Sequence, residues 1–152
     1  MNIILENSQQ VDCYTDMAAT FTAMRVNPRH YEWFVSDVET NGSVPLLSQG
    51  NIWITGDELA DVLEARIQFI WAVFSAFPVG MRIAVEKAPV ADGNPSFWQQ
   101  PKLLPQLTGA CFEVVCWDSC ATILIGVSEA QAAAFSRTYF DAKPLSCSGD
   151  GF

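Results

Sequence analysis

Residues 67–78, IQFIWAVFSAFP, are apolar at nearly every position, and only Gln68 and Ser75 interrupt them. Alternate positions are apolar on both sides of this run, so an extended chain would present two buried faces. Aromatic and β-branched side chains favour strand over helix here. The pattern therefore predicts a central strand that is covered above and below and that ends at Pro78, since proline cannot donate to a ladder.

Other short apolar runs predict further strands. They are residues 1–5, Tyr31 to Glu39, Asn51 to Ile54, Met81 to Val85 and a pair within residues 110–127 that turns at Trp117-Asp118-Ser119. Asn41-Gly42 is the strongest hairpin signal, because both residues adopt positive φ readily. We expect a strand to return from this turn at Ser43 and to be cut short by Pro45.

Three segments have helical spacing or helix-start signals. Apolar positions from Val11 to Met24 recur at the helical period, and the helix should close before Asn27-Pro28, where proline disfavours helical geometry in the preceding residue. Thr55 with Glu58 and Ser128 with Gln131 each match a capping box. They predict one helix from Thr55 to about Arg66 and a last helix after Ser128.

Residues 88–106 contain Pro89, Pro95, Pro101 and Pro105 and predict an irregular excursion, with Phe97 and Trp98 at its centre. Residues 146–152, SCSGDGF, predict a flexible tail. The order of elements predicts an α+β fold: a mainly antiparallel β-sheet with two or three amphipathic helices packed on it. Residues 1–152 are the length of a single domain.

The charge balance limits the partners. Seventeen acidic residues against eight Lys and Arg give a formal net charge of −9, and no basic cluster occurs. Nucleic acids and anionic membranes are therefore disfavoured, and a basic protein partner is favoured. The amino terminus lacks the features of a signal peptide, and no apolar run approaches the length of a spanning helix, so we expect a cytoplasmic protein. Five irregularly spaced cysteines fit free thiols.

We expect no catalytic residue, metal site or cofactor. The chain has one histidine, His30, and the spacing of Cys111, Cys116 and Cys120 does not match a zinc knuckle. No nucleophile elbow, phosphate loop or dinucleotide fingerprint occurs. The cysteines are read as small core residues, although the sequence does not say whether they have a redox role.

Two groups of residues are candidates for partner binding. Asp57, Asp61 and Glu64 share one helical face, which either meets only water or forms an acidic docking surface. Phe97, Trp98 and Trp53 either pack on the body or contribute to a binding hot spot. Trp33, Trp71 and Trp117 lie in predicted strands and are assigned to the core.

Part of the chain resembles a family of small uncharacterised proteins from Bacillus and relatives, a domain of unknown function. The resemblance is carried by Tyr31-x-Trp33-Phe34-Val35, Gly42, Leu46-Leu47, Asn51-x-x-Ile54-x-Gly56-x-Glu58-Leu59, Ala72-x-x-Ser75-Ala76-Phe77-Pro78 and Asp118-Ser119. It implies a bacterial cytosolic α+β domain and transfers no catalytic residue.

Three functions remain open. The first is a non-enzymatic immunity protein that neutralises a co-encoded basic toxin by occlusion, consistent with a small acidic chain that lacks a catalytic constellation. The second is a small-molecule-binding or enzymatic domain with a pocket under residues 88–106. The third is a structural subunit that self-associates through exposed aromatic residues. The oligomeric state does not follow from the sequence.

Overall fold

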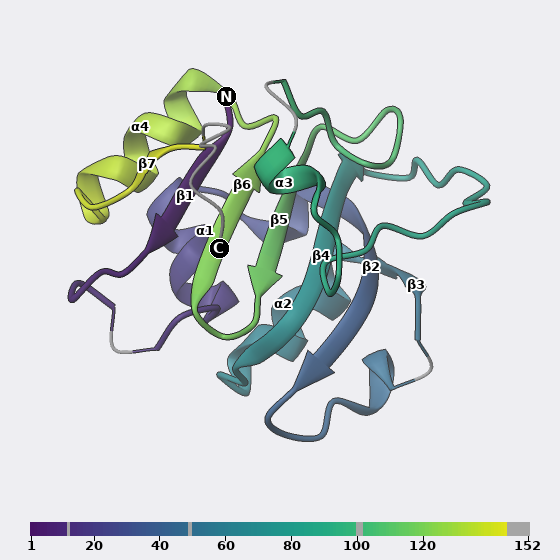
Figure 1. The fold of residues 1–152 in the computed structure, drawn as a ribbon. Coiled ribbons are helices and arrows are strands. Elements are labelled where there is room, and N and C mark those ends of the chain that lie inside the picture. The colour runs from purple at the N-terminus through teal and green to yellow at the C-terminus, as the bar shows by residue number, and fades with distance from the viewer. Residues whose placement is uncertain (12, 49, 100–101, 146–152) are drawn as a thin grey trace.

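The computed structural model describes residues 1–11, 13–48, 50–99 and 102–145. In this part of the chain, antiparallel strands form one seven-stranded sheet in the order β3-β2-β4-β5-β6-β1-β7 (Figure 1). The strands are β1 (Ile3–Glu6), β2 (Tyr31–Thr40), β3 (Ile52–Thr55), β4 (Phe69–Pro78), β5 (Phe112–Trp117), β6 (Ala121–Ile125) and β7 (Lys143–Pro144). The predicted α+β class with a mainly antiparallel sheet is confirmed. The predicted tail, residues 146–152, lies outside the described residues.

The helices cover the sheet unequally. Three longer helices, α1 (Met17–Met24), α2 (Gly56–Glu64) and α4 (Glu129–Thr138), bury side chains in one core with the same face of the sheet. The short helix α3 (Ser96–Gln99) lies on the opposite face, within the irregular segment that joins β4 to β5. Figure 1 shows α1 and α2 behind the sheet and α3 in front of it. We call these two sides the helix face and the loop face.

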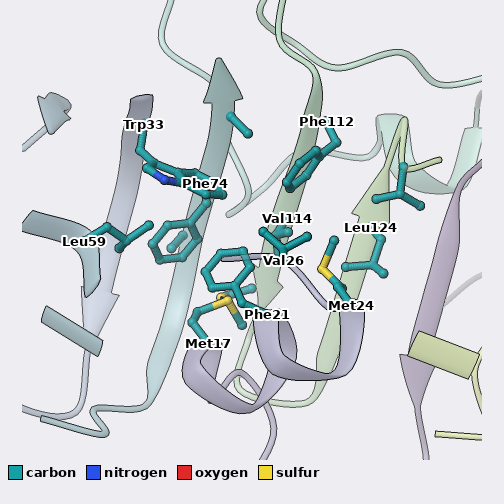
Figure 2. Packing of buried hydrophobic residues seen from close by; sticks show 14 of the residues in the cluster. Met17, Phe21, Met24, Val26, Trp33, Leu59, Phe74, Phe112, Val114 and Leu124 are labelled. Carbon is teal, nitrogen blue, oxygen red and sulfur yellow. The ribbon is translucent and has the colours of Figure 1, made fainter. Parts of the chain in front are cut away.

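The main core lies on the helix face. Phe21 of α1 is its centre: the ring centroid of Phe21 is 5.1 Å from that of Trp33 on β2 and 6.2 Å from that of Phe74 on β4. Figure 2 shows these rings together with Met17 and Met24 of α1, and Met24 lies beside Leu124 of β6. Aromatic rings of this size dominate core energetics because each removes a large apolar area from water.

The loop face carries two smaller clusters. Val73 of β4 and Val115 of β5 pack with Phe97 of α3, and nearby Phe34 and Phe77 pack with Leu107. Strand β4 is thus buried on both sides, as its continuous apolar run predicts.

Both capping boxes are confirmed. The Thr55 hydroxyl accepts a hydrogen bond from the Glu58 backbone N–H at 3.1 Å, and the Glu58 carboxylate accepts one from the Thr55 N–H at 3.0 Å. Ser128 and Gln131 do the same at the start of α4. These bonds satisfy amides that have no partner within the helix.

The predicted start of the first helix is wrong. The helix begins at Met17, not near Val11, with Asp16 as its N-cap accepting from the Ala19 N–H at 3.1 Å. Thr15 has a positive φ of 62°, which stops the helix from extending backwards. The hydroxyl of Thr15 also donates to the carbonyl of Phe69, which attaches this turn to the start of β4.

The predicted hairpin at Asn41-Gly42 is also wrong. No strand returns from this turn at Ser43; a 3-10 helix forms instead at Pro45–Leu47, and β2 pairs with residues 52–55. Asn41 bonds to Gln68 in both directions: its N–H donates to the Gln68 carbonyl, and its side-chain oxygen accepts from the Gln68 N–H. The Asn41 side chain is therefore used to tie the end of β2 to the approach to β4.

No strand forms at residues 81–85, contrary to the prediction. Strand β4 already has β2 on one side and β5 on the other, so a chain returning from Val79-Gly80 finds no free edge beside it. The chain instead leaves the sheet and rejoins β4 at Cys111, whose N–H donates to the Ala76 carbonyl at 2.7 Å. The predicted turn at Asp118-Ser119 is confirmed between β5 and β6, and both residues have positive φ.

Candidate functional site

Helix α2 presents an acidic stripe to solvent. Leu59 and Leu63 point into the main core, and Asp57, Asp61 and Glu64 lie on the outer side and are exposed. This division follows from the helical period, because residues three and four apart lie on the same face. The sequence-based prediction of one acidic face is confirmed as a feature of the surface.

The three carboxylates are not equivalent. Asp57 forms an ion pair with Arg29 of the neighbouring 3-10 helix (Pro28–His30) at 2.7 Å. This hydrogen bond raises the pKa of Arg29, and the charges of Asp61 and Glu64 act in the same direction. Within the described residues, neither Asp61 nor Glu64 forms an ion pair of its own. Asp61 and Glu64 are thus the carboxylates of this stripe that a cationic partner would meet.

Shallow grooves border α2 on both sides. One groove of about 480 Å³ lies between α1 and α2, with Phe21 and Leu63 among its lining residues and Glu64 and Arg66 also in its wall. The other, of about 350 Å³, lies between α2 and residues 43–46 and includes Asp61 in its wall. We call α2 with these two grooves the acidic ridge. Each groove combines apolar lining with a carboxylate.

The second predicted pair, Phe97 and Trp98, lies on the loop face and is therefore separated from the acidic ridge by the sheet. Phe97 is only 2% exposed and fills the space beneath the excursion together with Ala91. Phe97 is thus a core residue, which corrects the expectation that it meets a partner. Trp98 is half-buried.

The three tryptophans that the sequence assigns to the core differ in how deeply they are buried. Trp33 is fully buried, whereas Trp71 and Trp117 are half-buried at the loop face, so their assignment to the core is only partly correct. Their ring centroids lie 5.0 Å apart. Trp53 packs between Phe34 and Phe77, with centroid distances of 5.3 Å and 5.1 Å. Trp53 therefore has a packing role.

Side chains of β2 hold the first half of the excursion against the sheet. The Ser36 hydroxyl donates to the Pro89 carbonyl at 2.8 Å. The Asp37 carboxylate accepts hydrogen bonds from the N–H groups of Ala91 and Asp92, both at 2.8 Å. These bonds satisfy backbone groups that no strand or helix serves, which lets an irregular segment be buried.

Glu113 of β5 holds the second half of the excursion. Its carboxylate accepts from the Ser75 hydroxyl at 2.6 Å and from the Gln106 N–H, and the side chain of Gln106 in turn bonds to both backbone groups of Val90. Glu113 is buried, and burial raises its pKa to about 7, although the bonds to Ser75, Gln106 and Leu107 oppose this change. The carboxyl group is fully engaged as a tether.

The roles of Ser36, Asp37 and Glu113 do not follow from the pattern of apolar and polar residues. The signal for one of them was present: Glu113, like its partner Ser75, is a polar residue inside a strand that is otherwise almost wholly apolar. A buried polar residue requires a hydrogen-bond partner. That rule indicates that these residues bond to something, but not that the partner is the backbone of the excursion.

The cysteines and acidic residues of the described part do not gather into a group that could hold a metal ion. Cys116 is buried beside Met17, whereas Cys111 and Cys120 are exposed, so the three thiols do not converge. Burial raises the pKa of each of these thiols above its usual value, which keeps them protonated at neutral pH.

Among the described residues, every helix is too short or too polar to cross a lipid bilayer. No family model matches the chain, and neither a curated protein nor a solved structure shows significant similarity to it.

Proposed function

We propose that this protein is a non-enzymatic binding domain for a basic protein, and most concretely an immunity protein that neutralises a co-encoded toxin by occlusion in the bacterial cytoplasm. The observation that carries the proposal is the acidic ridge, in which Asp61 and Glu64 are exposed, form no ion pair with the described residues and line the two grooves beside α2.

Electrostatics supports a basic partner. The net charge of −9 attracts a cationic protein over a distance set by ionic strength, and a local excess of carboxylates on α2 orients it. Complementary charge mainly accelerates association, which suits an inhibitor that must reach a toxin before the toxin reaches its target.

The grooves support direct docking. Lys and Arg side chains carry a long apolar stem and a charged head, so they fit a groove with apolar lining and a carboxylate in its wall. Both grooves beside α2 have this composition, and Arg66 in the wall of the first groove is already paired with Asp16. Occlusion requires affinity and no chemistry, so exposed carboxylates such as Asp61 and Glu64 are sufficient for it.

The proposal is tested by affinity capture from a native host lysate at low and at high salt, with the bound proteins identified by mass spectrometry. The bait is compared with Asp61→Lys/Glu64→Lys and with Glu86→Lys/Glu129→Lys, a control that makes the same change in net charge at exposed positions away from the outer face of α2. A stoichiometric basic protein should be captured by the parent and by the control but not by the α2 variant.

The captured protein must then be toxic when expressed alone and harmless when this chain is co-expressed. Capture that is equal for all three baits would overturn the role of the acidic ridge. A captured partner without toxicity would overturn the immunity function while leaving protein binding intact. If no protein is captured and a small molecule raises the melting temperature, the binding-protein proposal is wrong.

A further inference from the structure

We propose that Trp71 and Trp117, with Glu39 and Asp118 beside them, form a second interaction surface that receives an arginine side chain from a basic protein segment. We call these four residues the tryptophan patch. It lies on the loop face, opposite the acidic ridge, and does not depend on the immunity function proposed above.

The two indoles are held by edge-to-face packing. The rings of Trp71 on β4 and Trp117 on β5 meet at an interplanar angle of 74° with their centroids 5.0 Å apart. Phe97 and Trp98 of α3 pack against Trp117 at 5.8 Å and 5.2 Å, with angles of 84° and 89°. Contacts of this geometry fix the ring orientation, so a ligand finds a preformed surface and little ordering entropy is lost on binding.

The patch remains partly open although a core residue of α3 packs against it. Phe97 is buried, while Trp71 and Trp117 are only half-buried. Tryptophan is one of the residues most enriched among those that dominate binding energy at protein interfaces.

Two acidic residues adjoin the tryptophans, one across the strands and one along the chain. Glu39 of β2 is the cross-strand partner of Trp71, so their side chains share the loop face, and Glu39 is exposed. Asp118 directly follows Trp117 at the start of the β5–β6 turn and is also exposed. Neither carboxylate forms an ion pair within the part of the chain that the structure describes.

This combination selects arginine. A cation is attracted to the face of an indole, and tryptophan is the strongest of the aromatic residues in this respect. The guanidinium group is planar, so it can stack on a ring while its N–H groups donate to carboxylates at the edge, whereas the ammonium group of lysine is a compact and more strongly hydrated charge. Charge complementarity with Glu39 and Asp118 excludes an acidic occupant.

The test uses the indole N–H signals of the ¹⁵N-labelled protein, assigned with Trp71→Phe and Trp117→Phe. The protein is titrated with a hexa-arginine peptide and, separately, with hexa-lysine. We expect hexa-arginine to shift the signals of Trp71 and Trp117 and to leave that of Trp33, which is buried on the helix face, in place. Following the indole signals separates binding at the patch from attraction to the acidic ridge.

The matched variant Glu39→Gln/Asp118→Asn removes the two charges, and asparagine tolerates the positive φ of position 118. The Kd of hexa-arginine for the patch, obtained from these shifts, should rise about fivefold in this variant. The Kd of hexa-lysine for the patch of the parent protein should be at least as high as that of hexa-arginine for the variant. Asp61→Lys/Glu64→Lys should leave the titration of the patch unchanged, so failure here and failure of the acidic ridge are distinguishable. The proposal would be overturned if hexa-arginine left the Trp71 and Trp117 signals in place. It would also be overturned if hexa-lysine shifted them equally, or if the double variant bound hexa-arginine as tightly as the parent does.

Discussion

The hydroxyl of Ser75 on β4 donates a hydrogen bond of 2.6 Å to the carboxylate of Glu113, which lies directly opposite it on β5. The same carboxylate accepts from the Gln106 N–H and so joins the sheet to the excursion between β4 and β5. Two polar residues that interrupt apolar strands thus serve one purpose. Together they give the backbone of the excursion at Gln106 a hydrogen-bond acceptor where it has no neighbouring strand to bond with.

This arrangement predicts that stability falls as the pH rises through neutrality. Burial raises the pKa of Glu113 from 4.5 to about 7, so the folded state binds this proton more tightly than the unfolded chain does. The contribution is fully present below pH 4.5 and is lost as the pH rises through about 7. The difference between the two pKa values corresponds to about 3 kcal/mol.

Glu113→Gln isolates this effect, because glutamine keeps the shape and cannot ionise. The difference in the free energy of unfolding between the parent and Glu113→Gln, measured by urea denaturation from pH 4.5 to 8.5, should change by about 3 kcal/mol in favour of the variant at high pH. A difference that stays constant over this range would show that Glu113 does not titrate there.

The hydrogen bonds of the Asp37 carboxylate predict a second effect on stability, confined to the excursion. Asp37→Gly keeps the positive φ of 53° accessible but removes the acceptor for the N–H groups of Ala91 and Asp92, and we expect a loss of about 2 kcal/mol. Hydrogen exchange at these two amides should accelerate more than elsewhere. Asp37→Asn is the matched control, since it retains an acceptor oxygen and also tolerates positive φ. Equal losses of stability in Asp37→Gly and Asp37→Asn would show that these hydrogen bonds do not hold the excursion.

Gly56 predicts a strong backbone effect at the start of α2. A Cβ at this position would lie 2.4 Å from the Pro28 carbonyl oxygen and 2.6 Å from the Arg29 Cα, both of them backbone atoms that cannot move aside. Gly56→Ala should therefore cost about 3 kcal/mol or more in thermal or urea unfolding.

Gly42→Ala is the control for this experiment. A Cβ at Gly42 meets only the flexible side chain of Ile67 at 3.7 Å, and we expect a change within about 0.5 kcal/mol. A large loss at Gly42 would instead indicate the tight Asn41-Gly42 hairpin that the sequence pattern favours and the structure lacks.

The sequence predicted the elements whose signals are local. The run of β4, the two capping boxes and the Asp118-Ser119 turn depend on neighbouring residues, and each formed as expected. The acidic face of α2 followed from helical period alone. These predictions succeeded because the physical cause lies within a few residues of its effect.

Three features that the sequence pattern did not predict have long-range causes. Asn41-Gly42 has the chemistry of a hairpin turn, but Asn41 bonds to Gln68, which is distant in sequence. Residues 81–85 could pair with β4 only if β5 did not occupy its edge. The tethers of Ser36, Asp37 and Glu113 bond to residues of the excursion that no periodic pattern brings near them. Such pairings depend on the completed topology.

The Asp118-Ser119 turn allows a stabilising substitution. Both residues have positive φ, 48° and 57°, and serine pays a steric cost there that glycine does not. Ser119→Gly keeps the backbone N–H that donates to the Ile70 carbonyl at 3.1 Å, and we expect a gain of about 0.5 to 1 kcal/mol in urea unfolding. Ser48→Gly, at a φ of −70°, is the control and should lose stability, because glycine there increases the entropy of the unfolded chain and removes the hydroxyl that donates to the Pro45 carbonyl at 2.7 Å. If both substitutions lowered stability, the strained turn between β5 and β6 would be ruled out.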